Sequence, residues 1–228
     1  MGTPSKQTVE IGHASARDIE RNFDRWATAV DVSNTPLGRS GQSLVKACRK
    51  KRLGIAMRPD FADVLVDVSS TYSPEATITT RSIVLSARVC DHVIGGLVAR
   101  PQLSVIGRVA VFGAAVQMQT LVRLMKLEIV AVEPEYQRKA VGATLVQFAL
   151  DELQRGQVHL VYGSFPADRS HLEHFYRGLG FTVPRNGYGI DVTKATGASL
   201  GIGPENNERL FAQSLGSGPK VVTLPAGH

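Results

Sequence analysis

The protein has 228 residues, of which 43% are hydrophobic and 20% are charged. This suits one globular domain with additions and a sizeable core, and it excludes wholesale disorder. The formal net charge of +6 fits either an ordinary basic surface or an anionic ligand or partner. The two cysteines, Cys48 and Cys90, lie far apart, which excludes a CxxC pair and a disulfide framework. We therefore expect a reducing, cytoplasmic setting. Charges interrupt every long apolar stretch, so we expect neither a membrane span nor a secretory signal.

The first predicted elements are a short strand and a helix within Val9–Val30. Ser15 and Asp18 have the spacing of a capping box at the start of that helix. Apolar side chains then recur at helical spacing: Ile19, Phe23, Trp26 and Val30. The Ser-, Gly- and Pro-rich stretch Ser33–Ser43 predicts a loop.

A basic cluster follows at Arg49–Arg52, where four cations are adjacent. Such a run is either a solvated surface or a contact for phosphates. Nucleic acid therefore stays open as a partner.

A hairpin is the next predicted feature. Alternating β-branched and apolar residues predict one strand over Thr77–Cys90 and a second over Val93–Ala99, with a turn at Asp91–His92. The pair Gly95–Gly96 predicts a bulge or close packing in the second strand.

The rest of the chain alternates between strands and helices. The expected elements are a strand at Lys126–Val132, a helix at Gly142–Arg155 ended by Gly156, a strand at Val158–Tyr162, a helix at His171–Leu179, and a short helix at Asn206–Leu215. The last dozen residues are expected to fray.

The segment between the strand and the helix is rich in small residues. Ala140, Gly142 and Ala143 would let a pyrophosphate approach the unpaired amides at the helix N-terminus, and Arg138 and Lys139 add positive charge. The pattern is neither a Walker A loop nor GxGxxG. It predicts an anion site.

Three motifs resemble those of the GNAT acetyltransferases. The pyrophosphate loop [QR]-x-x-G-x-[GA] reads Gln137–Gly142, the preceding V-x-P-x-Y reads Val132–Tyr136, and FYxxxGF reads Phe175–Phe181. The resemblance is strong over Lys126–Phe181 and extends, as an order of elements, to Val9–Val192. It does not cover the tail.

This resemblance implies an α/β (α+β) fold, with a mixed, mostly antiparallel sheet and helices on both faces. The parallel pair should be Leu127–Val132 and Val158–Tyr162. We expect a GNAT-like domain over residues 1–192, with an extended N-terminal part at 1–76 and the best-matched core at 77–181. Residues 193–228 are expected to form a partly ordered C-terminal extension.

The resemblance further implies acetyl transfer from acetyl-CoA to a primary amine, by direct attack in a ternary complex. It places the following residues against acetyl-CoA: Ile129, Val130, Ala131, Val132, Gln137, Arg138, Lys139, Ala140, Val141, Gly142, Ala143 and Arg169. Two of these depart from the family pattern. Ala140 replaces the first glycine of the loop and is tolerated if its φ is that of a right-handed helix. Arg169 replaces an asparagine that contacts the pantetheine arm in many members.

Two side chains are candidates for proton transfer. The resemblance makes Tyr176 the general acid that protonates the leaving thiolate, and the alternative is a packed core tyrosine. Glu128 shares the strand parity of Val130 and Val132 and is the candidate base, unless it is merely solvated. A metal role for the neighbouring histidines lacks a specified third ligand, so no metal is expected.

The acceptor stays open between a small-molecule amine, a protein lysine or N-terminus, and an amine of a nucleobase. A different acyl donor is a further alternative, as is a CoA-binding module without catalysis. The family habit also suggests a homodimer.

Overall fold

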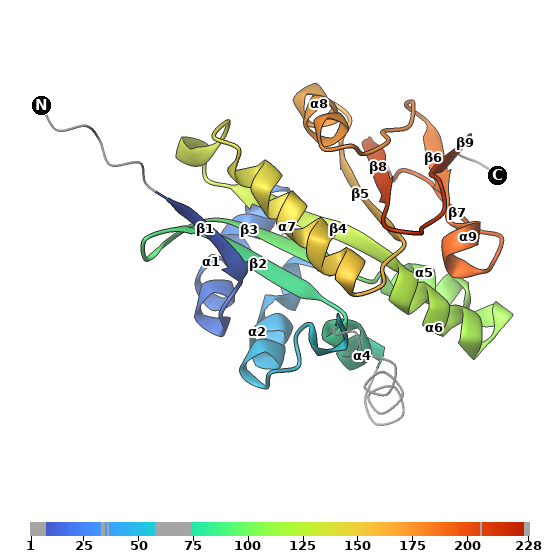
Figure 1. The fold of residues 1–228 in the computed structure, drawn as a ribbon, viewed down its shortest axis with the longest axis horizontal. Coiled ribbons are helices and arrows are strands. Elements are labelled where there is room, and N and C mark those ends of the chain that lie inside the picture. The colour runs from blue at the N-terminus through green and yellow to red at the C-terminus, as the bar shows by residue number, and fades with distance from the viewer. Residues whose placement is uncertain (1–7, 33–34, 36, 58–73, 206, 226–228) are drawn as a thin grey trace, which may run out of the picture.

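The computed structural model describes residues 8–32, 35, 37–57, 74–205 and 207–225 (Figure 1). The main sheet has six strands in the order β1-β2-β3-β4-β5-β8. Their bounds are, in chain order, Val9–His13, Ile83–Val89, His92–Arg100, Leu124–Val132, Leu160–Pro166 and Glu208–Ser214. All neighbours are antiparallel except β4 and β5, which run parallel. The expected mixed, mostly antiparallel sheet is therefore confirmed.

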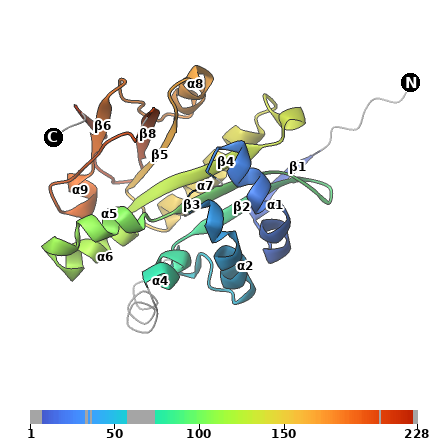
Figure 2. The same cartoon turned by 180° about the vertical axis from the view of Figure 1, so that it is seen from behind.

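Helices cover both faces of this sheet. α7 (Val141–Arg155) lies in front of it in Figure 1, and α1 (Ala16–Ala29) and α2 (Gly41–Arg49) lie on the opposite face, toward the viewer in Figure 2. The expected arrangement of helices is confirmed. The other helices are α4 (Pro74–Thr80), α5 (Leu103–Arg108), α6 (Ala114–Arg123), α8 (Ser170–Gly178) and α9 (Thr193–Thr196), with 3-10 turns η1 (Gly38–Ser40), η2 (Ile55–Met57), η3 (Ala110–Phe112) and η4 (Pro134–Tyr136).

The helix start expected at Ser15 is confirmed. The Ser15 hydroxyl accepts a hydrogen bond from the Asp18 N–H at 3.2 Å, and the Ser15 N–H donates to Oδ2 of Asp18 at 2.8 Å. The reciprocal bonds satisfy two amides at the helix N-terminus. Three members of the expected apolar stripe are buried, since Ile19, Phe23 and Trp26 are at most 2% exposed, and the fourth, Val30, is partly buried at the C-cap.

The hairpin of β2 and β3 carries the close packing expected at its glycines. A Cβ atom at Gly96 would lie 2.3 Å from the Trp26 ring, so only glycine lets α1 approach the sheet this closely. The register also shifts between Ala87 and Arg88, opposite Gly95, which confirms a bulge in this part of the hairpin.

Two expected local features are wrong. Thr77–Thr80 belongs to α4 rather than to a strand, because Ile78 is buried in a small cluster with Ala56 and Leu121. The expected loop Ser33–Ser43 includes η1 and the first residues of α2; residues 33, 34 and 36 lie outside the described residues.

The helix end expected at Gly156 is confirmed, since α7 ends at Arg155 and Gly156 is its C-cap, with a φ of −78°. Glycine is needed there for space, since a Cβ would lie 2.4 Å from Cε of Met57.

The C-terminal part also differs from the expectation. Residues 208–214 form β8, which pairs with β5, so the helix expected at Asn206–Leu215 is wrong. β6 (Tyr188–Asp191), β7 (Gly201–Ile202) and β9 (Val222–Pro225) form a second sheet in the order β7-β6-β9, so the fraying expected at the C-terminus does not extend to β9. The domain boundary expected at residue 192 stays a prediction.

Candidate active site

β4 and β5 are paired over only part of their length. The parallel ladder joins Leu124–Leu127 to Leu160–Gly163, whereas β4 stays paired with β3 up to Val132. β5 meanwhile continues alongside β8 to Pro166. The two strands therefore separate after Leu127, and within the described residues no strand covers the freed edge of β4. Backbone groups on such an edge can pair with an extended ligand.

A cleft with a volume of about 1740 Å³ opens at this separation. Its walls come from the end of β4, the loop before α7, the first turn of α7, the start of α8 and the C-terminal end of α1. Ligand pockets commonly measure roughly 300–1,000 Å³, so this cleft has room for two ligands at once. Most residues expected from the sequence line it: Glu128, Val130, Ala131, Val132, Gln137, Arg138, Ala140, Val141, Gly142, Ala143, Arg169 and Tyr176.

Two expected cofactor residues are absent from the cleft lining, as far as the described residues show. The Ile129 side chain is 1% exposed and packs in the core beneath α1, so only its backbone is left for a ligand. The Nζ atom of Lys139 lies 5.4 Å from the centre of the Tyr136 ring, a cation–π contact. A role for Lys139 in phosphate binding would require its side chain to leave that ring.

Residues 137–143, which we call the anion loop, line the cleft apart from Lys139. Arg138 and Ala140 have φ values of 57° and 62°, so both are left-handed. Ala140 is the N-cap of α7, and no side chain in the described residues caps this helix. The amides of the first turn, at Val141, Gly142 and Ala143, therefore lack a capping partner, and the helix dipole adds positive potential there.

The conformation of Ala140 differs from the one that would make alanine unstrained. A left-handed φ costs an alanine about 1–2 kcal/mol relative to the right-handed region. The loop therefore keeps the backbone geometry of a glycine at a position where the sequence has a methyl group.

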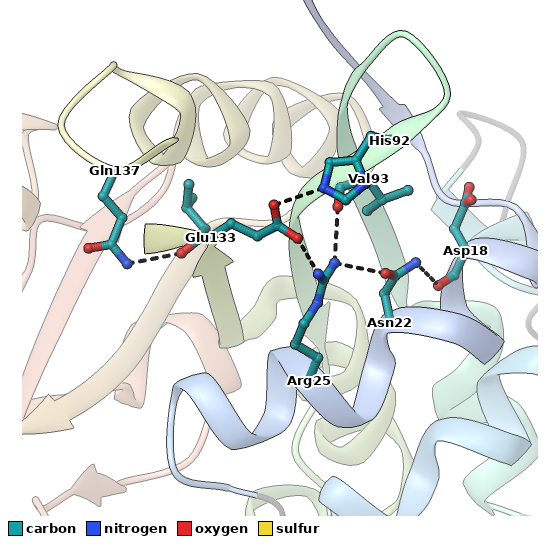
Figure 3. Close-up of polar contacts among 8 residues, drawn as sticks. Asp18, Asn22, Arg25, His92, Val93, Glu133 and Gln137 are labelled. Carbon is teal, nitrogen blue, oxygen red and sulfur yellow. Dashed lines mark hydrogen bonds and ion pairs between the residues drawn. The ribbon is translucent and has the colours of Figure 1, made fainter. Parts of the chain in front are cut away.

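The position of Gly142 is different, because the protein itself leaves space for a side chain. A Cβ atom there would lie 3.6 Å from Phe175 and from Val132, which is an ordinary contact. The free space beside Gly142 belongs to the cleft. Gln137 closes the other end of the loop, since its Nε2 donates to the carbonyl oxygen of Val132 at 2.9 Å (Figure 3).

Glu128 occupies a bulge in β4. The pairing with β3 steps from Val98–Ile129 to Ala99–Leu127, which leaves Glu128 without a cross-strand partner. The bulge breaks the simple alternation that the sequence suggested. The carboxylate is well shielded, with 4% of the side chain exposed.

Polar neighbours hold the Glu128 carboxylate in place. Nε2 of Gln102 donates to its Oε1 at 2.9 Å, and Nε of Arg100 lies 3.4 Å from its Oε2. Neither neighbour was singled out from the sequence, because no local motif marks them.

Tyr176 is 6% exposed and sits in an aromatic cluster at the cleft. Its ring stacks on Phe211 with centroids 3.6 Å apart and meets Phe175 and Phe181 edge-on. Burial raises the pKa of the Tyr176 hydroxyl, so the group stays protonated at neutral pH. The hydroxyl thus carries the proton that a general acid donates, but the raised pKa makes it a weaker acid, and the packing is also that of a core tyrosine.

Further side chains line the cleft beside α8 and β8. Arg169 lines the cleft from the N-cap of α8, and His171 follows it. Ser164 on β5 and the carboxylates of Glu205 and Glu208 line the wall beside β8. Glu208 was missed because a helix was expected where β8 runs, and Glu205 lies in a stretch for which no element was expected.

The basic cluster Arg49–Arg52 is absent from the described cleft lining. It lies at the end of α2, where Nη2 of Arg49 pairs with Glu20 at 2.8 Å.

The described residues contain no group of three or more His, Cys, Asp or Glu side chains placed to hold a metal ion. Among the same residues, no helix has the length and apolarity to cross a membrane.

Comparison with known proteins agrees with this geometry. Residues 85–183 match the family model described as an acetyltransferase (GNAT) domain. No curated protein matches the chain. A structure of yncA from Salmonella typhimurium, solved with its cofactor acetyl-CoA, aligns at 14% identity over 96% of this chain and 99% of that one, with a TM-score of 0.55.

Two further solved structures have the same fold. A GNAT-family structure from Desulfovibrio desulfuricans aligns at 11% identity over 91% of this chain and 99% of that one, with a TM-score of 0.52. The ribosomal-protein-alanine N-acetyltransferase of Brucella melitensis aligns at 16% identity over 90% and 99%, with a TM-score of 0.51. The sheet, the cleft and the motifs define an acetyltransferase fold. Residues 85–183 match a GNAT acetyltransferase domain, which confirms the family resemblance of this part of the sequence.

Proposed function

We propose that the protein transfers an acetyl group from acetyl-CoA to a primary amine by direct attack in a ternary complex. The proposal rests on one observation, that four features of the structure meet at the same cleft. The freed edge of β4, the uncapped amides of α7, Glu128 and Tyr176 all open into it. A fold relative solved with acetyl-CoA supports the same donor.

The anion loop fits the pyrophosphate of such a donor. The amides of Val141, Gly142 and Ala143 would bind its oxygens, and Arg138 and Arg169 would add charge from the rim. The extended pantetheine arm suits the freed edge of β4 over Glu128–Val132, where a ligand can pair like an additional strand.

The thioester supplies the activated acetyl group, and the remaining steps belong to the protein. Glu128 takes the proton of the incoming ammonium, directly or through water. A backbone N–H near Val130 stabilises the negative charge that develops on the carbonyl oxygen. As the C–N bond forms and the C–S bond breaks, Tyr176 donates its proton to the departing thiolate, and the second proton lost by the amine nitrogen restores the phenol.

The acceptor class stays open between small-molecule amines, protein amines and amines of nucleobases. One fold relative bears the name ribosomal-protein-alanine N-acetyltransferase, which makes peptides with a free N-terminus a sensible first group to screen. Nucleic acid is the weaker candidate, because Arg49–Arg52 is absent from the described cleft lining. Steeply salt-dependent binding of DNA or RNA would restore it.

The test is amine-dependent release of CoA, measured as free thiol, for the wild type and for Tyr176→Phe. The substitution should lower kcat on the order of a hundredfold and leave the Kd for acetyl-CoA unchanged. Tyr188→Phe is the matched control, since Tyr188 is 36% exposed on β6, and it should retain full activity. Binding of acetyl-CoA without turnover of any amine would contradict the proposal and favour a CoA-binding module. If only another acyl-CoA supports turnover, that compound and not acetyl-CoA is the donor.

A further inference from the structure

Glu133 lies at the junction between β4 and the segment that leads to the anion loop, and two side chains hold it. Its Oε1 accepts a hydrogen bond from Nη1 of Arg25 on α1, and its Oε2 lies 2.9 Å from Nε2 of His92 at the start of β3 (Figure 3). Its backbone N–H donates to the carbonyl oxygen of Ile94 at 2.8 Å. The side chain of Glu133 is 17% exposed and that of Arg25 is 47% exposed, so solvent screens this ion pair in part.

Arg25 is itself fixed in one orientation. Its Nη2 donates to the carbonyl oxygen of Val93 at 3.0 Å and to Oδ1 of Asn22 at 2.8 Å. Asn22 in turn donates from Nδ2 to the carbonyl oxygen of Asp18 at 2.8 Å (Figure 3). A guanidinium that is held by partners on three elements is a rigid link rather than a mobile surface charge.

The chain from Glu133 to the anion loop is a closed turn. The Glu133 carbonyl oxygen accepts the Tyr136 N–H at 2.9 Å, and the Gln137 N–H donates to Pro134 at 3.3 Å. The side chain of Gln137 then returns to Val132 at 2.9 Å. Since these bonds leave little freedom between them, the position of Glu133 sets where the anion loop begins.

Helix α1, which carries Arg25, also borders the cleft through its C-terminal end. Its last residues and the turn that follows, Ala29–Val32, line the cleft wall. Neither Arg25 nor Glu133 belongs to the described lining, so neither is placed to touch a ligand. The ion pair therefore connects α1 to the segment before the anion loop, and both of these border the cleft, although the pair itself does not line it.

We propose that Arg25 and Glu133 are positioning residues that hold the anion loop in register with the α1 wall of the cleft. This inference rests on the proposed function. Breaking the pair should let the loop amides shift away from the arrangement that binds a pyrophosphate. The affinity for CoA should therefore fall, while the chemical step, once the ternary complex has formed, changes little.

The experiment compares the wild type with Arg25→Met, Glu133→Gln and the double variant. Glu20→Gln is the matched control, because Glu20 lies on the same helix and pairs with Arg49 at 2.8 Å, in an ion pair that is absent from the described cleft lining. Calorimetry with CoA should give a Kd raised about fivefold or more in each single variant, with no further rise in the double variant. The KM for acetyl-CoA should rise in parallel while kcat stays within about twofold.

A second measurement does not depend on any ligand. Hydrogen–deuterium exchange should speed up at the amides of residues 138–143 in Glu133→Gln and stay unchanged in Glu20→Gln. Unchanged exchange and unchanged CoA affinity in Glu133→Gln would overturn the inference. So would an equal loss of affinity in the Glu20 control, because it would report general destabilisation. If the wild type binds no CoA, the proposed function itself fails, and faster exchange at the loop would still show that the pair positions it.

Discussion

Oε1 of Glu128 accepts a hydrogen bond of 2.9 Å from Nε2 of Gln102, although the two residues lie on different elements. The contact brings the start of α5 to the point where β4 leaves β5. The hydrogen bond fixes the carboxylate of Glu128 at the wall of the cleft. A general base needs a carboxylate that is held in place in this way.

Replacing Glu128 with Gln keeps the shape of the side chain and removes the base. We expect kcat/KM for the amine to fall on the order of a hundredfold, with the Kd for acetyl-CoA unchanged. The measurement is initial-rate kinetics with the best amine of the screen. An unchanged rate would exclude Glu128 as the base and leave its carboxylate a structural group in the bulge.

Ala140→Gly should stabilise the protein. The left-handed φ of 62° costs alanine about 1–2 kcal/mol, whereas the greater freedom of an unfolded glycine costs roughly 0.5–1 kcal/mol. The strain is the larger of the two effects, so urea unfolding should show a gain of about 0.5–1 kcal/mol. A loss of stability would mean that the loop does not hold this conformation in solution.

Arg81 should be a large contributor to stability. It is fully buried and donates to the carbonyl oxygens of Ala56, Val122 and Gly156 at 2.5, 2.6 and 2.9 Å. Burial lowers its pKa to about 10, so it remains charged at neutral pH. Arg81→Met would leave these carbonyls unpaired and should cost about 3 kcal/mol or more in urea unfolding. Arg155→Met, at a residue whose side chain is 66% exposed, should cost at most about 1 kcal/mol. Equal effects would contradict this account.

Asp18 should make stability depend on pH in the acid range. Burial by itself raises the pKa of this carboxyl, but hydrogen bonds from Arg88 and Ser15 outweigh it and hold the pKa below its usual 3.8. Because the native pKa is depressed, the ionised group stabilises the fold above about pH 3.8 and loses this contribution as the pH falls through the native value. Asp18→Asn should therefore destabilise at pH 7, and the difference should shrink below pH 3.8. A difference that is constant from pH 7 to pH 3 would contradict the assignment.

Sequence patterns predicted the parts of the fold whose signals are local. The capping box at Ser15 and the apolar stripe of α7 need only neighbours along the chain, and the anion loop follows from small residues before that helix. β8 could not be predicted in this way. Leu210, Phe211 and Ala212 are all buried, because both faces of the sheet are covered at this point. Such a continuous apolar run does not distinguish a strand from a helix.

The site depends on long-range features that the sequence does not display. The bulge at Glu128 arises from the register between β3 and β4, and it changes which way that side chain lies. Arg100, Gln102 and Glu208 join the site only through tertiary packing. The ion pair of Arg25 with Glu133 likewise joins residues more than a hundred positions apart.

The proposed function requires that the anion loop binds acetyl-CoA. The most direct test is calorimetric titration of acetyl-CoA into the wild type, Gly142→Glu and the control Gly12→Glu. A Cβ atom meets no close contact at either glycine, but of the two only Gly142 lines the cleft. The account predicts micromolar binding that Gly142→Glu abolishes and Gly12→Glu preserves. Absence of binding to the wild type, or binding that survives Gly142→Glu, would contradict it.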